Sequence, residues 1–261
     1  MADWALVLGS SSGFGEACAR AFAADGFNVY GVHLDRKSTM PHVEEVIAAI
    51  RSVGRDVEFF NVNAADPAKR EEIVSHIKGR LDGTGDQVRV LLHSLAFGTL
   101  KPYIGKEGQA GLAQRELEMT LDVMANSLLY WARDLVENGL MREGGRIYSM
   151  TSTGDFHAWP SYGAVSAAKA ALEAHTRQLA LELAPRGITA NAIRAGVTDT
   201  PALRKIPGSS EMVESAQKKN PHRRLTTPED VARALIVLAR PETAWITGNI
   251  IGVDGGEEIA G

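Results

Sequence analysis

The chain has 261 residues, of which 44% are hydrophobic and 23% are charged, and its formal net charge at pH 7 is −4. This charge excludes a general attraction to nucleic acid or to anionic membranes. No apolar run approaches the roughly 20 residues of a membrane span, and the N-terminus lacks a secretory signal pattern. We therefore expect neither nucleic acid nor a membrane as a partner.

The chain contains one cysteine, Cys18, which excludes an internal disulfide and a cysteine-rich metal cluster. Cys18 stands between Ala17 and Ala19, where a buried and inert thiol is expected. The histidines show no metal-ligand spacing, so we expect no metal. A thiol that stays reduced indicates a cytoplasmic location.

An apolar run at residues 4–8 leads directly into a glycine-rich turn at residues 9–15, followed by a helix at residues 16–24 and a strand at residues 29–33. Glycines at a strand-to-helix turn let backbone N–H groups approach a pyrophosphate, and the helix dipole helps. Such turns are common, but this position in a strand–turn–helix–strand unit favours dinucleotide binding. The cofactor-binding residues expected here are Gly9, Ser11, Ser12, Gly13, Phe14 and Gly15.

Five further strands are predicted, with helical patterns between them. They cover residues 57–62, 88–93, 146–149, 189–193 and 249–253. Seven strands that alternate with helices predict an α/β fold with a Rossmann-type, doubly wound parallel sheet. Because the sequence shows no linker, no low-complexity tract and no longer repeat, residues 1–261 are expected to form a single domain.

A long helix is predicted after the strand at residues 146–149. Pro160 suits its first turn, where a missing N–H costs nothing. Apolar residues then repeat at helical spacing until Pro185 and Gly187 stop the pattern.

This helix would carry Tyr162 and Lys169 on nearly the same face, separated by roughly 10.5 Å along the axis. The preceding strand would deliver Ser152 to the same edge of the sheet, where open α/β sheets bind ligands. Tyrosine and lysine at this spacing are common on helices. The glycine-rich turn at the front of the chain is what favours a catalytic interpretation.

Several motifs together resemble the short-chain dehydrogenase/reductase superfamily over essentially the whole chain. They are the glycine turn, the tyrosine–lysine helix, the segment Asn191-Ala-Ile-Arg-Ala-Gly196 and the segment from Thr247 to Gly256. Most members of that superfamily carry Tyr-x3-Lys, but the residue four before Lys169 is Val165, which cannot transfer protons. The Tyr-x6-Lys spacing resembles instead the divergent enoyl-acyl-carrier-protein reductases.

Other positions resemble the same branch. A His-Ser pair at His93 follows the fourth strand, an Ala-Gly pair ends at Gly196, and Asp122 stands where the classical catalytic asparagine would fall. The helix is most similar to that of the third, NADPH-using type of bacterial enoyl reductase. Ser152 occupies the place of a second active-site tyrosine in the commonest type, whereas the third type also has serine there.

The spacing has a chemical interpretation. In enoyl-thioester reduction the hydride goes to the β-carbon, while negative charge develops on the thioester oxygen three bonds away. Moving the tyrosine from four to seven residues before the lysine displaces it by about 4.5 Å along the helix. Tyr162 would donate to the developing enolate, and Ser152 would contact the substrate or the nicotinamide. Lys169 would hold the nicotinamide ribose, its charge also lowering the phenol pKa.

The resemblance also implies cofactor contacts outside the glycine turn. The expected residues are Asn63, Ala64, Ser94, Gly196, Thr198 and Thr200. Structural interpretations stay open for several positions: Ser152 as a strand end, His93 as a packed turn residue, and the two threonines as turn caps.

Apolar residues gather in the loops at the predicted carboxyl edge of the sheet. They are Phe97, Leu100, Tyr103, Phe156, Trp159, Leu203, Ile206 and Met212. Core packing would explain some of them, but so many in loops favour an acyl-chain pocket. The substrate contacts expected first are Phe97, Tyr103, Phe156, Trp159 and Leu203, with residues 198–225 as a covering lid.

The part of this predicted lid from Thr200 to Leu225 is locally basic. It carries Arg204, Lys205, Lys218, Lys219, Arg223 and Arg224 against Glu211 and Glu214. Such a rim would speed encounter with an acidic acyl carrier protein, although a solvated helix face explains the charges equally well.

The choice of cofactor depends on the end of the second strand. An acidic residue there would bind the ribose hydroxyls of NAD, whereas a basic residue would accept the 2′-phosphate of NADP. The usual acidic position falls on His33, and Arg36 with Lys37 follow Asp35. This pattern favours NADPH, with NADH as the alternative.

The sequence therefore predicts an NAD(P)H-dependent reductase of 2-enoyl thioesters, carried by an acyl carrier protein or by coenzyme A. A ketone or alcohol oxidoreductase that uses Tyr162 is the second interpretation. A non-catalytic dinucleotide-binding protein is the third, since a protein can keep this fold without keeping the catalytic activity. The resemblance also implies a homotetramer.

Overall fold

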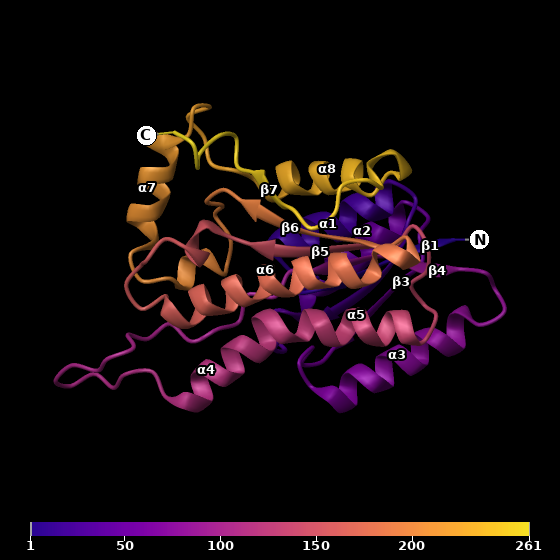
Figure 1. Cartoon of the computed structure of the whole chain (residues 1–261), viewed down its shortest axis with the longest axis horizontal. Helices are drawn as coiled ribbons and strands as arrows, with labels where there is room; N and C mark the ends of the chain where they lie inside the picture. The colour runs from indigo at the N-terminus through magenta and orange to yellow at the C-terminus, as the bar shows by residue number, and fades with distance from the viewer. Residues whose placement is uncertain (1, 261) are drawn as a thin grey trace.

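The computed structural model describes residues 2–260 and contains all seven predicted strands in one parallel sheet (Figure 1). The strands are β1 (Asp3–Leu8), β2 (Asn28–His33), β3 (Val57–Asn61), β4 (Gln87–His93), β5 (Arg146–Thr151), β6 (Thr189–Ala195) and β7 (Ile250–Val253). Their spatial order is β3-β2-β1-β4-β5-β6-β7, and every pairing is parallel. This order, with helices on both faces, is the single-domain Rossmann architecture that the alternation of strands and helices predicted.

The helices form a layer on each face of the sheet (Figure 1). One layer consists of α1 (Gly13–Ala24), α2 (Met40–Ser52) and α8 (Pro228–Leu238). The other consists of α3 (Pro67–Leu81), α4 (Gln114–Leu121), α5 (Ser127–Glu137) and α6 (Gly163–Leu183). The remaining helix, α7 (Ser209–Lys219), stands beyond the ends of the strands, inside the predicted lid.

The central strands β1, β2, β4, β5 and β6 are buried along most of their length because both faces of the sheet are covered. Trp4 of β1 stacks on Tyr30 of β2 with ring centroids 4.1 Å apart. On the α5 side, the fully buried Trp131 donates from Nε1 to the carbonyl of Ala64 at 2.8 Å. These contacts hold the middle of the sheet rigid, so the loops at the strand ends are presented from a fixed base.

The structure corrects the predicted start of the long helix. α6 begins at Gly163, and Tyr162 is its N-cap residue rather than a residue within the helix. The cause is Ser161, whose φ of 62° interrupts the right-handed helix after Pro160. The predicted end is confirmed: α6 stops at Leu183, and Gly187 adopts a left-handed φ of 68° after a 3₁₀ turn.

A π-helical segment, Asp122–Asn126, separates α4 from α5. Such segments place an extra residue in a turn and often occur at functional sites. This one packs against α6. Within residues 2–260, no helix combines the length and the apolar character needed to cross a membrane.

Candidate active site

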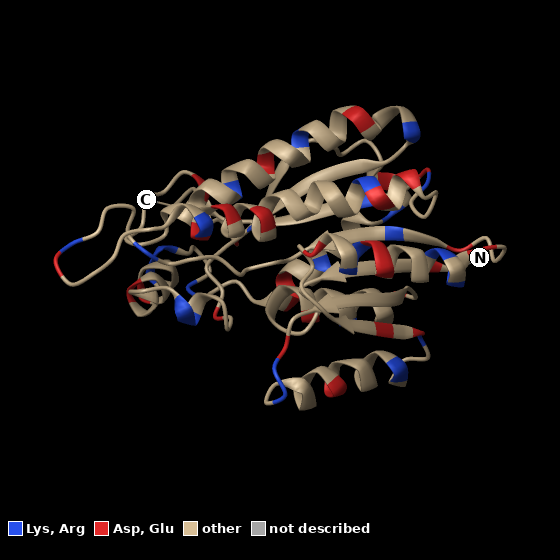
Figure 2. Cartoon of the chain, turned by 90° about the horizontal axis from the view of Figure 1, so that it is seen from below, with Lys and Arg blue, Asp and Glu red and all other residues tan. Residues whose placement is uncertain are grey.

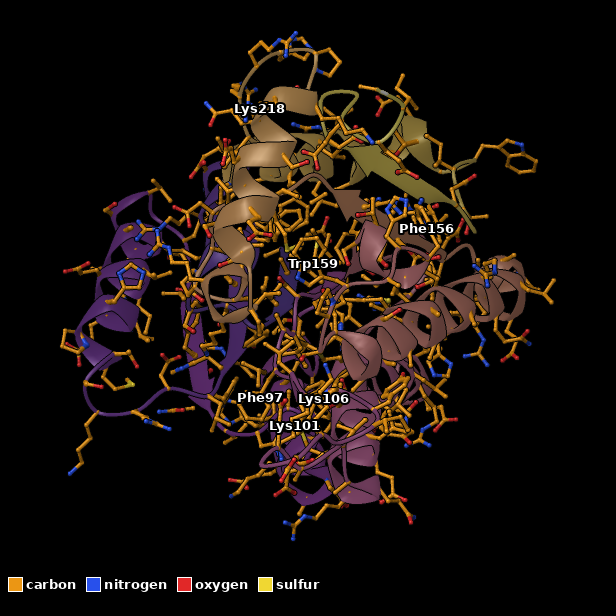
Figure 3. The ribbon with its side chains drawn as sticks, turned by 90° about the vertical axis from the view of Figure 1, so that its left-hand side faces the viewer. Phe97, Lys101, Lys106, Phe156, Trp159 and Lys218 are labelled. Atoms are coloured by element: carbon orange, nitrogen blue, oxygen red, sulfur yellow. The ribbon has the colours of Figure 1, made fainter. Side chains whose placement is uncertain are left out.

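The loops at the carboxyl ends of the strands surround the face shown in Figure 3. Trp159 lies near the middle of this face, with Phe156 to one side of it. Phe97, Lys101 and Lys106 lie below, on the loop between β4 and α4, and α7 stands above. The predicted substrate residues labelled there, Phe97, Phe156 and Trp159, therefore lie on one face of the molecule.

Tyr162 lies beside Ser152, against the turn that follows β5. Burial raises the pKa of the Tyr162 phenol above its ordinary value, and the adjacent Ser152 hydroxyl offsets only part of the rise. The expectation that Lys169 would lower the phenol pKa is therefore wrong for this structure, since burial dominates. The phenol is protonated at neutral pH and is a hydrogen-bond donor.

Lys169 lies deeper, on the buried side of α6. Its Nζ donates to the carbonyl of Met150 at 2.6 Å, and the side chain is almost fully buried. Burial lowers the Lys169 pKa to about 8, although the charge of Glu173 opposes this effect. One of the three ammonium donors is thus held by the strand, which leaves two for a ligand.

Val165, four residues before Lys169, is part of the core and not of the site. Its side chain is 5% exposed. A β-carbon built on Gly98 would stand 2.9 Å from Val165 Cγ2, so the two residues are in direct contact. The position that usually carries the proton donor faces packed side chains here, and Tyr162 is the phenol that lies beside Ser152.

The glycine turn has the shape that a pyrophosphate requires. Gly9 has a φ of 88°, and a β-carbon on Gly15 would stand 1.9 Å from the carbonyl oxygen of Gly9. Both positions therefore need glycine for the close approach of strand and helix. Ser12, the N-cap of α1, makes no side-chain cap, so the first N–H groups of the helix stay available to an anion.

Asp35 lies beside the same turn, two residues after β2. Partial burial alone would raise its pKa, but the side chains of Ser11, Thr39 and His33 face the carboxylate and bring the pKa below its ordinary value. His33 Nδ1 is 3.0 Å from Asp35 Oδ2. An ionised carboxylate thus stands where the sequence analysis found no usable acid. The side chains of Arg36 and Lys37 are exposed.

Three predicted cofactor residues make contacts that organise the backbone. Asn63 Oδ1 accepts from the N–H of Ala65 at 3.0 Å, and the Ala64 carbonyl accepts from Trp131. The N–H of Ser94 donates to the end of β1 at 2.8 Å. These residues border the site, but their known contacts are structural. Phe14 is half-buried and packs partly against the core.

The two threonines after β6 cap their own turn, as the structural interpretation expected. Thr198 Oγ1 donates to the carbonyl of Gly196 at 2.9 Å, and Thr200 Oγ1 accepts from the N–H of Leu203 at 3.2 Å. Thr200 also lies against the glycine turn, since a β-carbon on Gly13 would be 3.4 Å from its methyl group. The start of the predicted lid is thus in contact with the glycine turn.

His93 is a packed interior residue. Its Nε2 is 2.9 Å from Ser127 Oγ, and that hydroxyl donates to the carbonyl of Val123 at 2.8 Å, so Nε2 carries the proton. Burial, with the nearby charge of Lys169, lowers the His93 pKa to about 3. The neutral ring links β4 to the π-helical segment.

The substrate-side residues divide into two groups. Phe97 and Phe156 are exposed at the rim, and Leu203 begins a 3₁₀ turn. Tyr103 and Trp159 make specific contacts. A β-carbon on Gly163 would be 2.5 Å from the Tyr103 ring. Trp159 Nε1 donates to the carbonyl of Pro207, in the predicted lid, at 2.9 Å.

A profile of the family described as Enoyl-(Acyl carrier protein) reductase matches residues 9–258 of the chain. The chain belongs to the short-chain dehydrogenase/reductase superfamily, in this enoyl-reductase-like branch. The family resemblance and the fold predicted from the sequence are thereby confirmed, and the protein is an oxidoreductase.

Individual members of this superfamily differ in what they act on. An enoyl-acyl-carrier-protein reductase (NADH) of Nostoc sp. is 34% identical over 183 residues, which cover 70% of this chain and 67% of that protein. A 3beta-hydroxysteroid dehydrogenase 1 of Eggerthella lenta is 29% identical over 252 residues, which cover 96% of this chain and 92% of that protein. The crystal structure of an enoyl-acyl-carrier-protein reductase (NADH) from Aquifex aeolicus superposes with a TM-score of 0.83 at 25% identity, covering 99% and 97% of the two chains.

This short-chain reductase also carries functional candidates that the sequence analysis missed. The carboxylates of Asp155 and Glu173 meet the guanidinium of Arg194 next to Ser152. Arg194 was visible only as part of a family motif, and nothing in the sequence spacing joins it to the two acids. Within residues 2–260, no cluster of three or more His, Cys, Asp or Glu side chains is placed to hold a metal ion.

Proposed function

We propose that this protein reduces the 2,3 double bond of enoyl thioesters, using hydride from a nicotinamide dinucleotide. The observation that carries the proposal is the placement of Tyr162. The phenol stands at the N-cap of α6, beyond the position where Val165 is packed into the core. A donor displaced in this way suits an oxygen remote from the carbon that receives the hydride. The family profile and the Nostoc relative support the same reaction.

The residues of the chain have distinct tasks in this reaction. The bound dinucleotide supplies the hydride. The glycine turn and the N-terminus of α1 bind its pyrophosphate, and Lys169 uses its two remaining donors on the ribose. Tyr162, protonated because burial raises its pKa, donates to the thioester oxygen as negative charge develops there. Ser152 orients the phenol.

The contacts of Asp35 support NADH as the preferred cofactor. An ionised carboxylate beside Ser11 accepts hydrogen bonds from ribose hydroxyls and repels a 2′-phosphate. Both enoyl reductases named above are described as using NADH. The sequence-based preference for NADPH depends on Arg36, which is exposed and free to meet a phosphate. NADPH is therefore the alternative that the cofactor comparison tests.

The acyl carrier is less strongly indicated than the sequence suggested. Arg204 pairs with Asp199 at 2.7 Å, Lys218 with Glu214 at 2.6 Å, and Arg224 with Asp230 at 2.6 Å. Half of the six cations of the predicted lid are thus neutralised by acids, two of which lie outside the counted segment. Figure 2 shows blue and red segments interleaved over the whole chain. The carrier can be an acyl carrier protein or coenzyme A, and a homotetramer in the cytoplasm stays part of the proposal.

The decisive experiment supplies the purified protein with crotonyl-CoA or acetoacetyl-CoA and follows the absorbance of NADH and NADPH. Oxidation of the dinucleotide with crotonyl-CoA, and little with acetoacetyl-CoA, is the expected result. The reverse preference would replace the proposal by a ketone reductase, which the hydroxysteroid dehydrogenase relative favours as the second candidate. Binding of dinucleotide without turnover of either thioester or of a hydroxysteroid would indicate a non-catalytic protein.

A further inference from the structure

A single guanidinium beside the site meets three carboxylates. Arg194 Nη2 lies 3.1 Å from Asp155 Oδ2 and 3.2 Å from Glu173 Oε1, and its Nη1 lies 3.1 Å from Glu258 Oε1. The side chains of Arg194, Asp155 and Glu173 are 14%, 9% and 6% exposed. The ring of Phe156 covers the guanidinium, with its centroid 4.9 Å from Arg194 Cζ. The reaction described above does not use this cluster.

The cluster joins three elements around one residue of the site. Thr151, the last residue of β5, donates from Oγ1 to Glu173 Oε1 at 2.8 Å. Asp155 closes the 3₁₀ turn that follows the same strand. Ser152 lies between these two anchors, so the backbone is held to α6 just before it and to β6 just after it.

We infer that Arg194 is a positioning residue: by drawing Asp155 and Glu173 together, it fixes Ser152 and the following turn against Tyr162. The inference rests on the proposed function, since Tyr162 and Ser152 are taken as the reacting site. Within residues 2–260, the hydrogen bonds of the Arg194 side chain go to carboxylates and not to Tyr162 or Ser152, so Arg194 acts through the carboxylates. The Thr153–Asp155 turn, which the guanidinium holds, is the backbone that packs on the Tyr162 ring.

The charge balance argues against a purely stabilising role. One guanidinium faces three carboxylates, and Asp155 Oδ1 is buried without a hydrogen-bond partner among residues 2–260. Burial raises the Glu173 pKa, and the neighbouring Asp155 carboxylate raises it further against the opposing contacts of Thr151 and Arg194. Buried ions with incomplete partners cost folding free energy. A cluster of this composition contributes little to the free energy of unfolding. It does fix two segments against β6: the turn that contains Asp155 and the segment that contains Glu258.

The first experiment compares Arg194→Met with Arg70→Met. Arg70 pairs with Asp134 at 2.7 Å with both side chains mostly buried, but the pair joins α3 to α5 and has no part in the turn after β5. Loss of Arg194 should lower kcat on crotonyl-CoA by about 10²-fold, the scale of a 1 Å misplacement of reacting groups, while KM for the dinucleotide changes little. Arg70→Met should leave kcat within about twofold at a temperature where each variant is folded. Equal losses in the two variants, or an unchanged kcat in Arg194→Met, would overturn the inference.

A pH titration gives a readout that a structural role would not move. The charged groups around Glu173 are Arg194 on β6, Asp155 in the turn, Lys169 on α6 and, across the guanidinium, Glu258. Without Arg194, which opposes the rise in the Glu173 pKa, Glu173 supports the charge of Lys169 less, so the pH above which dinucleotide affinity falls should move downward. Asp155→Asn should not move it downward, because loss of a neighbouring negative charge keeps Glu173 ionised. A downward shift in both variants, or in neither, contradicts the inference.

A last measurement separates this inference from the proposed function. Hydrogen exchange of the backbone over residues 152–160 needs no substrate. Arg194→Met should lose protection there relative to Arg70→Met, and the isosteric Asp155→Asn serves in its place if Arg194→Met does not fold. Loss of protection in a protein that reduces no thioester would refute the function and keep the positioning role. Unchanged protection in an active enzyme would refute the positioning role alone.

Discussion

Gly154 lies against the ring of Tyr162: a β-carbon built on Gly154 would stand 2.5 Å from Tyr162 Cε1 and 3.3 Å from Ser152 Oγ. Real β-carbons do not approach other atoms so closely, so the ring rests directly on the backbone of the turn after β5. The position of the phenol is thus set by the absence of a side chain at residue 154. The backbone of this turn therefore supports the ring of the proposed proton donor.

Gly154→Ala should therefore displace the Tyr162 ring and lower kcat by about 10²-fold, the scale of a 1 Å misplacement. The cost in stability should stay near the 1–3 kcal/mol typical of overpacking. Steady-state kinetics and thermal unfolding measure the two effects. Gly79→Ala is the matched control, because Gly79 lies within α3 with nothing near its β-position and should gain about 1 kcal/mol of stability without a change in kcat. A fully active Gly154→Ala enzyme would remove the turn from the account of the site.

Tyr162→Phe removes the phenol hydroxyl and keeps the aromatic ring against the backbone of Gly154. Loss of one donor to developing negative charge typically lowers the rate by about 10²–10³-fold, so kcat on crotonyl-CoA should fall by this factor. Dinucleotide affinity, measured by fluorescence titration, should change little. Tyr130→Phe, on the outer side of α5 near Arg70 and Arg133, is the control for loss of a phenol elsewhere. Full activity of Tyr162→Phe would show that another group supplies the proton.

Much of this architecture could be predicted because it repeats along the chain. Each strand is a short apolar run ended by a turn, and the seven strands were found within about two residues of their ends. The start of α6 was missed because Pro160 is compatible with a first turn, while the left-handed φ of Ser161 has no sequence signal. Arg194 and its acids were missed because parallel pairing brings them together over long separations in the chain. Asp35 was not predicted as a ribose ligand because the usual acidic position falls on His33. The conformation of the loop after β2, which brings the Asp35 carboxylate to Ser11, has no sequence signal.

The lowered pKa of Lys169 predicts a pH limit for cofactor binding. Because burial brings this pKa to about 8, the ammonium is lost above that pH, and affinity for the dinucleotide should fall there. Titrations from pH 6.5 to 9.5, values chosen to bracket the pKa by about 1.5 units on either side, measure the effect. Lys169→Arg keeps its charge and should abolish the fall, even where its overall affinity is weaker. A flat profile in the wild type would contradict a ribose contact.

The same shift predicts how stability depends on pH without cofactor. Between about 8 and the ordinary lysine value of 10.5, the unfolded chain holds a proton that the native chain has released. The free energy of unfolding contributed by Lys169 should therefore rise with pH across this window and be lost as the pH falls through 8. Denaturant unfolding of the wild type and of Lys169→Met compares the slopes. Equal slopes would indicate that Lys169 has an ordinary pKa.

Cofactor preference should depend on Asp35 and Arg36 in opposite directions. The wild type should have the higher kcat/KM with NADH. Asp35→Ala removes the repulsion of a 2′-phosphate and should move the NADPH-to-NADH ratio of kcat/KM upward by about tenfold, equivalent to about 1.4 kcal/mol. Arg36→Ala should move the ratio downward. A wild-type preference for NADPH that Arg36→Ala abolishes would restore the sequence-based assignment.

The contact between Trp159 and the predicted lid leads to the last prediction. Trp159 Nε1 donates to the Pro207 carbonyl at 2.9 Å, and a β-carbon on Gly208 would be 3.2 Å from the indole ring. Gly208 has a φ of 78° and is the N-cap of α7, so this contact fixes the point from which the helix starts.

Trp159→Phe removes the hydrogen bond and leaves part of the ring contact. Because one hydrogen bond contributes about 1 kcal/mol, KM for the thioester should rise roughly fivefold, and kcat and dinucleotide affinity should hold. Trp159→Ala should raise KM further, since the ring contact with Gly208 is lost as well. Trp245→Phe is the control, because that indole is 97% exposed and lies outside the lid. If Trp159→Phe and Trp159→Ala both have the wild-type KM for the thioester, residues 198–225 do not cover the substrate through Trp159.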